Sequence, residues 1–185
     1  MNIFNYFSTE YAIFVHDQII ITSGGILGII NDGLLESSIE HIKNDLYYPN
    51  IEDKLTHLFF SINKNHCFND GNKRASIALS AYFLEINNCS FIIPRFIEQM
   101  ENITVDVADN RIDKELLYEI IISLLYEEDY SESLKLKIMK QKLQFSILLL
   151  FINLFATAQT FDVGNLRYNI ISGTNVSVQK TNTNP

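Results

Sequence analysis

The chain has 185 residues, of which 47% are hydrophobic and 19% charged, a balance that excludes a wholly disordered chain. The formal net charge of −8 disfavours nucleic acid as a partner, because neutralising phosphates requires basic side chains. The two cysteines, Cys67 and Cys89, form no Cys-x-x-Cys pair. This excludes a disulfide scaffold or a cysteine zinc module and favours a reducing, cytoplasmic location.

The charge is unevenly spread along the chain. Residues 1–133 carry a formal charge of −13, whereas residues 134–185 carry +5. Helical periodicity dominates the first part, and no strand pattern of useful length precedes residue 160. The sequence therefore predicts an all-α domain over residues 1–130 and an appendage over residues 131–185.

A first amphipathic helix is predicted to begin at Asn31 or Asp32, since either side chain can cap it. Its apolar residues recur at helical spacing at Leu35, Ile39, Ile42 and Leu46. The segment 45–50, with the sequence DLYYPN, contains a proline and paired tyrosines. We expect a connection here rather than a helix.

The next helix has an apolar face at Leu55, Leu58, Phe59 and Ile62 and should end near Asn65. Residues 74–86 are small and apolar nearly all round, which is typical of a helix buried at the centre of a bundle. Pro94 can open a further helix at its first position, and Asp113 can cap another.

The appendage begins with four lysines, followed by an apolar run over residues 143–158. We expect a helix over 134–158 that packs on the domain, and an irregular or disordered tail over 159–185. Alternatively, residues 139–159 have the form of a secretory signal, which would indicate a membrane anchor or the remnant of a fusion. The run is shorter than the ~20 residues of a spanning helix, so membrane contact through 143–158 is not favoured.

The most informative segment is residues 66–74, HCFNDGNKR, at the entry to the predicted central helix. A helix N-terminus attracts phosphate, and Lys73 and Arg74 add positive charge to an otherwise acidic domain. Asp70 is a suitable oxygen ligand for Mg²⁺ held jointly with nucleotide phosphates. His66 carries an imidazole, which can accept a proton from a hydroxyl. Taken singly these residues would be a turn and a solvated surface; together they supply the groups that phosphoryl transfer needs.

This segment resembles the signature of the Fic/Doc (Fido) family, His-x-Phe-x-Asp/Glu-Gly-Asn followed by Gly or Lys and then Arg. The Gly-Asn-Lys-Arg form is similar to the Doc (death-on-curing) branch, as is the upstream segment GIINDGLLESSIE. The resemblance covers roughly residues 10–126. It implies a compact helical bundle with a short β-hairpin-like flap, and ATP-dependent modification of a protein hydroxyl.

By position, the resemblance makes His66 the general base and Asp70 the Mg²⁺ ligand. The phosphates of ATP would be bound by Gly71, Asn72, Lys73 and Arg74. The 45–50 connection would be the flap that holds the target peptide, with Tyr47 and Tyr48 as contacts. Ordinary packing explains these two tyrosines equally well.

Two departures from the family pattern bear on the transferred group. Family members that transfer AMP usually have a glycine where this chain has Lys73, and a second arginine where it has Ile77. A Doc-like enzyme instead binds ATP turned around and transfers the γ-phosphate. We therefore expect protein kinase activity, with AMPylation as the alternative.

The resemblance also implies partners. The protein substrate would be a translation factor. The self-inhibitory Ser/Thr-x-x-x-Glu-Gly/Asn pattern has its nearest match at Ser123–Glu127 and fails at Glu128, so we expect a small Phd-like antitoxin to act in trans. Two other hypotheses remain, a catalytically silent binding module and a membrane-tethered effector. We interpret Cys67 as filler, and His16, His41 and His57 as structural or solvated.

Overall fold

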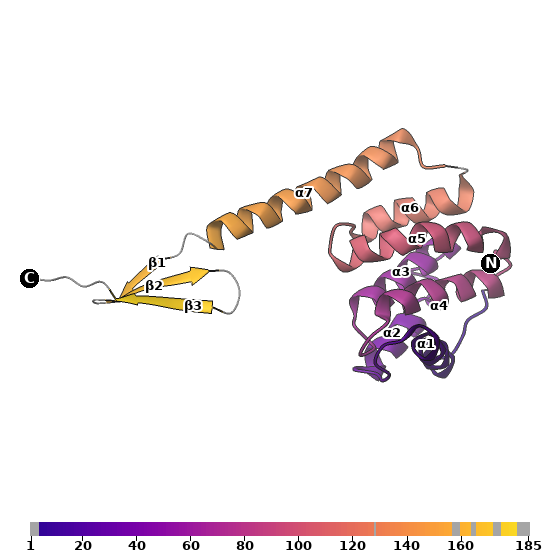
Figure 1. The fold of residues 1–185 in the computed structure, drawn as a ribbon. Helices are drawn as coiled ribbons and strands as arrows, with labels where there is room; N and C mark the ends of the chain where they lie inside the picture. The colour runs from indigo at the N-terminus through magenta and orange to yellow at the C-terminus, as the bar shows by residue number, and fades with distance from the viewer. Residues whose placement is uncertain (1–3, 128, 157–159, 164–165, 172–174, 181–185) are drawn as a thin grey trace, which may run out of the picture. The chain divides into compact units, whose positions relative to one another are not determined.

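The computed structural model describes residues 4–127, 129–156, 160–163, 166–171 and 175–180. The chain divides into two compact units, Met1–Gln141 and Lys142–Pro185. The first unit holds six complete helices and the beginning of a seventh among its described residues (Figure 1). In chain order the helices are α1 (Thr9–Ser23), α2 (Asp32–His41), α3 (Ile51–Lys64), α4 (Asn72–Ile86), a 3-10 turn (Ser90–Ile92), α5 (Ile93–Ala108), α6 (Lys114–Tyr126) and α7 (Glu132–Ala156).

The helix ends follow the capping residues in the sequence. The side chains of Asn31 and Asp113 accept hydrogen bonds from the backbone N–H groups of Leu34 and Leu116, as predicted. Helix α3 ends at Lys64 with Asn65 as its C-cap, near the predicted end, and Pro94 lies in the first turn of α5. Helix α1, capped by Ser8, was not predicted individually.

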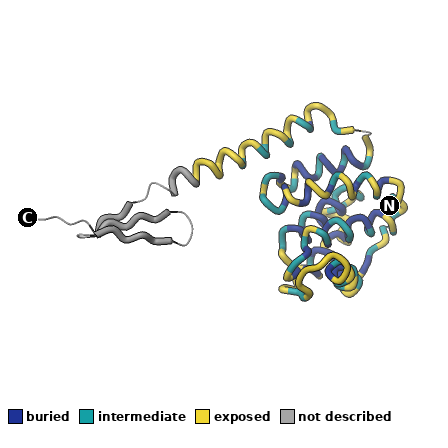
Figure 2. Tube along the Cα trace, in the orientation of Figure 1, coloured by how far each residue is buried: buried dark blue, intermediate teal, exposed yellow. Residues whose placement is uncertain are grey.

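Helix α4 lies at the centre of the first unit, as its apolar sequence predicts. It packs against α1, α3 and α5. Its side chains Leu79, Phe83 and Leu84 are fully buried, and the buried segments of α3 run beside it (Figure 2). The all-α class predicted for this domain is confirmed. A central helix of this kind gives the loop at its N-terminus a rigid base.

The connection between α2 and α3 differs from the expected hairpin-like flap. Residues 43–50 form turns with no strand assigned to them, since Asn44 and Pro49 favour turn geometry over an extended ladder. Leu46, expected on the apolar face of the preceding helix, lies beyond its end and is 84% exposed. A β-bridge near the motif joins Ile29 to Phe68 instead.

The beginning of α7 belongs to the first unit. Lys137 donates to Glu119 of α6 at 2.6 Å, and Gln141 donates to Asp113 at 2.6 Å. The unit boundary follows Gln141, later than the predicted boundary after residue 130. The structure forms the helix predicted over 134–158, as far as these residues are described. The packing of its apolar run on the domain stays a prediction.

The second unit contains the remainder of α7 and a three-stranded antiparallel sheet in the order β1 (Thr160–Val163), β2 (Leu166–Ile171) and β3 (Asn175–Lys180). The expected irregular or disordered tail is thus replaced by strands over these ranges, consistent with the alternation and β-branched residues there. Residues 157–159, where the signal-like segment ends, lie outside the described residues. Among the helices that the structure describes, none is long and apolar enough to cross a membrane.

Candidate active site

Residues 66–74 form the loop between α3 and α4 and the first turn of α4. One cavity of about 350 Å³ is lined by all six of the predicted motif residues: His66, Asp70, Gly71, Asn72, Lys73 and Arg74. Asn63 and Ala108, from the ends of α3 and α5, complete the wall beside the motif. The structure therefore brings together the proton acceptor, the carboxylate and the basic residues that the sequence singled out.

Buried side chains and one amide hold this loop in shape. Cys67 and Phe68 are fully buried, which confirms the interpretation of Cys67 as filler. The side chain of Asn72 accepts from the backbone N–H of Phe68 at 3.0 Å and donates to its carbonyl at 2.8 Å. Both the oxygen and the nitrogen of the amide bond the Phe68 backbone, so the Asn72 side chain stabilises the loop. Only the backbone N–H of Asn72 is then left to bind a phosphate.

The turn into α4 needs a glycine. Gly71 caps the helix with a φ of +74°, a left-handed conformation that glycine adopts without a Cβ penalty. The first turn of α4 then presents backbone N–H groups with no intrahelical partner toward the cavity. Together with Lys73 and Arg74 they form a cationic wall suited to phosphate.

His66 is available for chemistry. Its side chain is exposed and lines the cavity, just beyond the end of α3. It makes no hydrogen bond or ion pair with any other residue that the structure describes. Its φ of +48° turns the chain sharply into the buried Cys67–Phe68 pair. An imidazole free at both nitrogens and open to the cavity can accept a proton from a bound hydroxyl.

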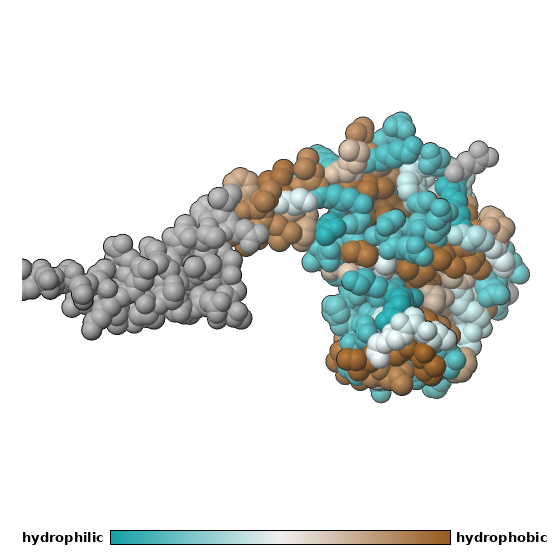
Figure 3. Space-filling model, in the orientation of Figure 1, coloured by the Kyte–Doolittle hydropathy of each residue, from teal (hydrophilic) through white to brown (hydrophobic). Residues whose placement is uncertain are grey.

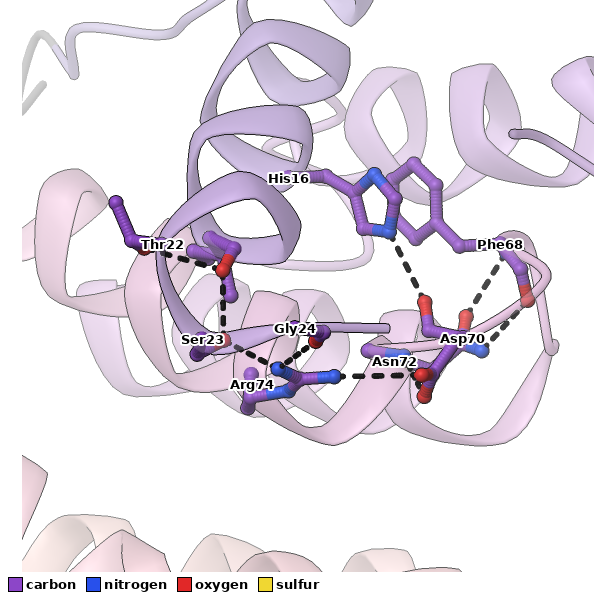
Figure 4. Close-up of polar contacts among 10 residues, drawn as sticks. His16, Thr22, Ser23, Gly24, Phe68, Asp70, Asn72 and Arg74 are labelled. Carbon is purple, nitrogen blue, oxygen red and sulfur yellow. Dashed lines mark hydrogen bonds and ion pairs between the residues drawn. The ribbon is translucent and has the colours of Figure 1, made fainter. Parts of the chain in front are cut away.

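Asp70 is held in its ionised form. Its Oδ1 accepts from the Gly71 N–H at 2.5 Å, and its Oδ2 lies 3.5 Å from Nη2 of Arg74 (Figure 4). The Gly71 amide, and after it the Arg74 guanidinium, hold the pKa of Asp70 below its usual value. The carboxylate is therefore negative at neutral pH and half-exposed toward the cavity.

This donor set fits Mg²⁺ brought with a nucleotide better than a resident metal ion. No group of three or more His, Cys, Asp or Glu side chains that could hold a metal occurs among the described residues. A single carboxylate beside a cationic wall is the usual arrangement when substrate phosphates and water provide the remaining ligands. Asp70 would hold such an ion, which would offset the charge of the nucleotide phosphates.

Helix α1 and the segment after it form part of the site that the sequence pattern missed. Nη1 of Arg74 donates to the hydroxyl of Ser23 and, at 2.8 Å, to the carbonyl of Gly24. A Cβ on Gly25 would lie 2.5 Å from Oδ2 of Asp70, so only glycine fits there. The Gly-Gly pair at the end of α1 was the available sequence signal for this close approach.

The segment that follows, residues 24–31, runs alongside the motif loop. Ile30 donates its backbone N–H to the carbonyl of Cys67 at 2.7 Å, and Asn69 donates to the carbonyl of Gly28 at 3.0 Å. Ile26, Leu27 and Ile30 are exposed. Figure 3 shows apolar surface at the end of the first unit where α1 and α2 lie. An extended, apolar surface thus borders the motif loop.

Tyr47 and Tyr48 lie elsewhere. Both line a separate cavity of about 720 Å³ between the α2–α3 connection and α6, and the structure does not bring them to the cavity of His66. The Tyr48 hydroxyl lies within hydrogen-bond distance of Nδ1 of buried His57, at 2.9 Å, and Nζ of Lys114 lies 3.0 Å from the same nitrogen. Burial, followed by the charge of Lys114, lowers the pKa of His57 to about 4. These contacts favour the packing interpretation for Tyr48, and the role of Tyr47 and Tyr48 in holding a target peptide stays a prediction.

Comparisons with known proteins agree with this geometry. The sequence model described as the Fic/DOC family matches residues 6–84, which include α1, the 24–31 segment and the motif. The chain is 31% identical over 97 residues to a protein named Toxin Doc from Mycolicibacterium smegmatis. The match covers 50% of this chain and 75% of that protein. With its motif residues around one cavity and this similarity, the chain belongs to the Fic/DOC family.

Proposed function

We propose that this protein is a Doc-like toxin that transfers the γ-phosphate of Mg-ATP to a hydroxyl of a protein. The observation that carries the proposal is that His66 and Asp70 line one cavity with the cationic N-terminus of α4. The name of the Mycolicibacterium smegmatis relative supports a toxin role. A translation factor as substrate, a Phd-like antitoxin as partner and a cytoplasmic location are the accompanying expectations.

Each residue has a defined part in this reaction. The substrate hydroxyl attacks the γ-phosphorus while its proton passes to His66, and the bond to the β-phosphate oxygen breaks to release ADP. Lys73, Arg74 and the N–H groups of α4 hold the phosphates in line. Asp70 would hold the Mg²⁺ that offsets the phosphate charge.

The choice of phosphate over AMP follows from two side chains. Lys73 is exposed on the cavity wall, and its bulk occupies the space that a glycine would leave for an α-phosphate. Ile77, one turn along α4, offers an apolar side chain where a second arginine would bind phosphate. AMPylation remains the alternative, because it uses the same base and the same carboxylate.

The 24–31 segment is the better candidate for holding the target peptide. Its backbone bonds to the motif loop, whereas Tyr47 and Tyr48 line a different cavity. An extended target segment could lie against the exposed Ile26, Leu27 and Ile30 and present its hydroxyl to His66.

A labelling experiment distinguishes phosphorylation from AMPylation. Purified protein is incubated with bacterial lysate and ATP labelled at either the α- or the γ-phosphate. Label transferred from γ-ATP alone supports phosphorylation, and label transferred from α-ATP indicates AMPylation. His66→Ala should abolish transfer, whereas His41→Ala, at an exposed histidine of α2, should leave it unchanged. Transfer undiminished by His66→Ala would overturn the assigned role.

A further inference from the structure

A buried histidine outside the motif lies against the motif loop. His16, on α1, has no exposed surface. Its ring stacks in parallel on the ring of Phe68, with centroids 3.8 Å apart and an interplanar angle of 3° (Figure 4). The expectation that His16 is structural or solvated accounts for the burial but not for its polar contacts.

Both nitrogens of His16 are engaged. Nε2 lies 2.9 Å from the backbone carbonyl oxygen of Asp70, and Nδ1 lies 3.0 Å from Oδ1 of Asp17. A carbonyl oxygen and a carboxylate oxygen can only accept hydrogen bonds, so Nε2 donates to the Asp70 carbonyl, and Nδ1 donates to Asp17 in the doubly protonated ring. The ring is therefore fixed at one end by Asp17 and presents a directed donor to the Asp70 peptide at the other.

This donor acts on the peptide group that positions the Asp70 carboxylate. The carbonyl of Asp70 and the N–H of Gly71 belong to one planar peptide unit, so fixing the direction of one fixes the other. That same N–H donates to Oδ1 of Asp70 at 2.5 Å. Because Gly71 adopts a φ of +74°, this peptide has no regular helical hydrogen bond to orient it.

We propose that His16 is a positioning residue that fixes the plane of the Asp70–Gly71 peptide and thereby aims the Asp70 carboxylate at Mg-nucleotide. The inference rests on the proposed function. The contacts run from Asp17 to His16, from His16 to the peptide, and from the peptide N–H to the carboxylate. Such outer contacts typically change metal affinity or activity by roughly 10–100-fold when they are removed.

The test compares His16→Phe with Ile20→Val. Phenylalanine keeps the ring that stacks on Phe68 and removes both nitrogens. Ile20 is a buried neighbour on the same helix face, whose Cδ1 approaches the Gly71 loop without a polar contact. Two quantities are measured on the full chain: the amide resonance of Gly71 by NMR, and the Mg²⁺ affinity in the presence of a non-hydrolysable ATP analogue by calorimetry.

We expect His16→Phe to move the Gly71 amide resonance and to weaken Mg²⁺ binding by about 10-fold or more, with a fall in kcat that exceeds any change in KM for the protein substrate. Ile20→Val should lower the melting temperature while leaving Mg²⁺ affinity within about 2-fold, since it removes one buried methylene only. A folded His16→Phe protein with unchanged resonance and Mg²⁺ affinity would overturn the inference.

Two further measurements distinguish a failure of this inference from a failure of the proposed function. If His16→Phe does not fold, Asp17→Ala takes its place, because the Asp17 side chain is 39% exposed and its loss releases Nδ1 of the ring, which loosens the orientation of the donor at Nε2. A Gly71 resonance that is unmoved in Asp17→Ala then contradicts the inference. If the wild-type protein binds no Mg-nucleotide, the proposed function fails, and the Gly71 resonance alone decides whether His16 orients the peptide.

Discussion

Arg74 faces Asp70 across the mouth of the cavity, with Nη2 of the arginine 3.5 Å from Oδ2 of the aspartate, while its Nη1 is bonded to the end of α1. The guanidinium thus joins two elements that are far apart in the sequence. It also keeps the aspartate ionised, because a nearby positive charge stabilises the carboxylate.

Removing this arginine should impair nucleotide binding more than stability. We expect Arg74→Ala to weaken ATP binding by about 10-fold or more, since a charge-assisted contact to phosphate is lost. The effect on unfolding should be small, because the side chain is partly exposed. Calorimetric titration with ATP analogue and urea unfolding measure the two effects. Arg95→Ala, at an arginine that bonds the Glu127 carbonyl instead, is the matched control.

The two glycines after α1 allow a sharp comparison. Gly25→Ala places a Cβ 2.5 Å from Oδ2 of Asp70, whereas Gly24→Ala meets no atom within 4 Å. Both positions have positive φ, so both variants carry backbone strain of about 1–3 kcal/mol. Transfer activity should fall much further in Gly25→Ala, because only that variant displaces the carboxylate. Equal activity losses at matched stability would show that Asp70 tolerates displacement.

Asn72 and Lys73 are neighbours with separable roles. Asn72→Ala leaves the Phe68 backbone groups without their partner and should lower the free energy of unfolding by about 1–3 kcal/mol. Lys73→Ala should leave stability within about 0.5 kcal/mol, since the side chain is exposed, and should reduce ATP affinity. Urea unfolding and nucleotide titration on both variants check this. If Lys73→Ala loses stability and binds ATP normally, Lys73 stabilises the fold and does not bind the nucleotide.

His57 predicts a loss of stability in mild acid. Its pKa is about 4 in the folded protein, below the 6.5 expected when unfolded, so the unfolded chain binds the proton more tightly. Stability from this group is present above pH 6.5 and is lost as pH falls toward 4, by about 3 kcal/mol. Urea unfolding at a series of pH values between 7 and 4 measures this loss of stability. In His57→Gln, which keeps a polar partner for Tyr48, the decline should be shallower; an identical decline would assign the effect to other groups.

The sequence supplied the motif and the central helix but not the elements that complete the site. The segment HCFNDGNKR carries its polar groups in adjacent residues, so the local pattern identifies six of the nine residues that line the cavity. Helix α1 is apolar on most sides, which hides the helical period on which that reasoning depends. The contacts of His16 and Gly24 with the motif span more than forty-five residues of chain, and no local pattern encodes them.

Tyr47 and Tyr48 illustrate the opposite difficulty. A proline beside paired tyrosines indicates a turn correctly, and the structure forms turns there. Which cavity the turn faces depends on how α3 and α6 pack, and the tyrosines line the cavity between those elements. Residues 26–30 do run beside the motif. They carry no polar side chain, so the sequence offers no sign that they belong to a site.

The bonds between residues 24–31 and the motif loop have a practical consequence for inhibition. The carbonyl of Gly24 accepts from the Arg74 side chain, the carbonyl of Gly28 accepts from the Asn69 N–H, and the Ile30 N–H donates to the Cys67 carbonyl. A compound that separates residues 24–31 from the motif loop would break all three hydrogen bonds at once. On the proposed function, such a compound would block the protein without competing with ATP.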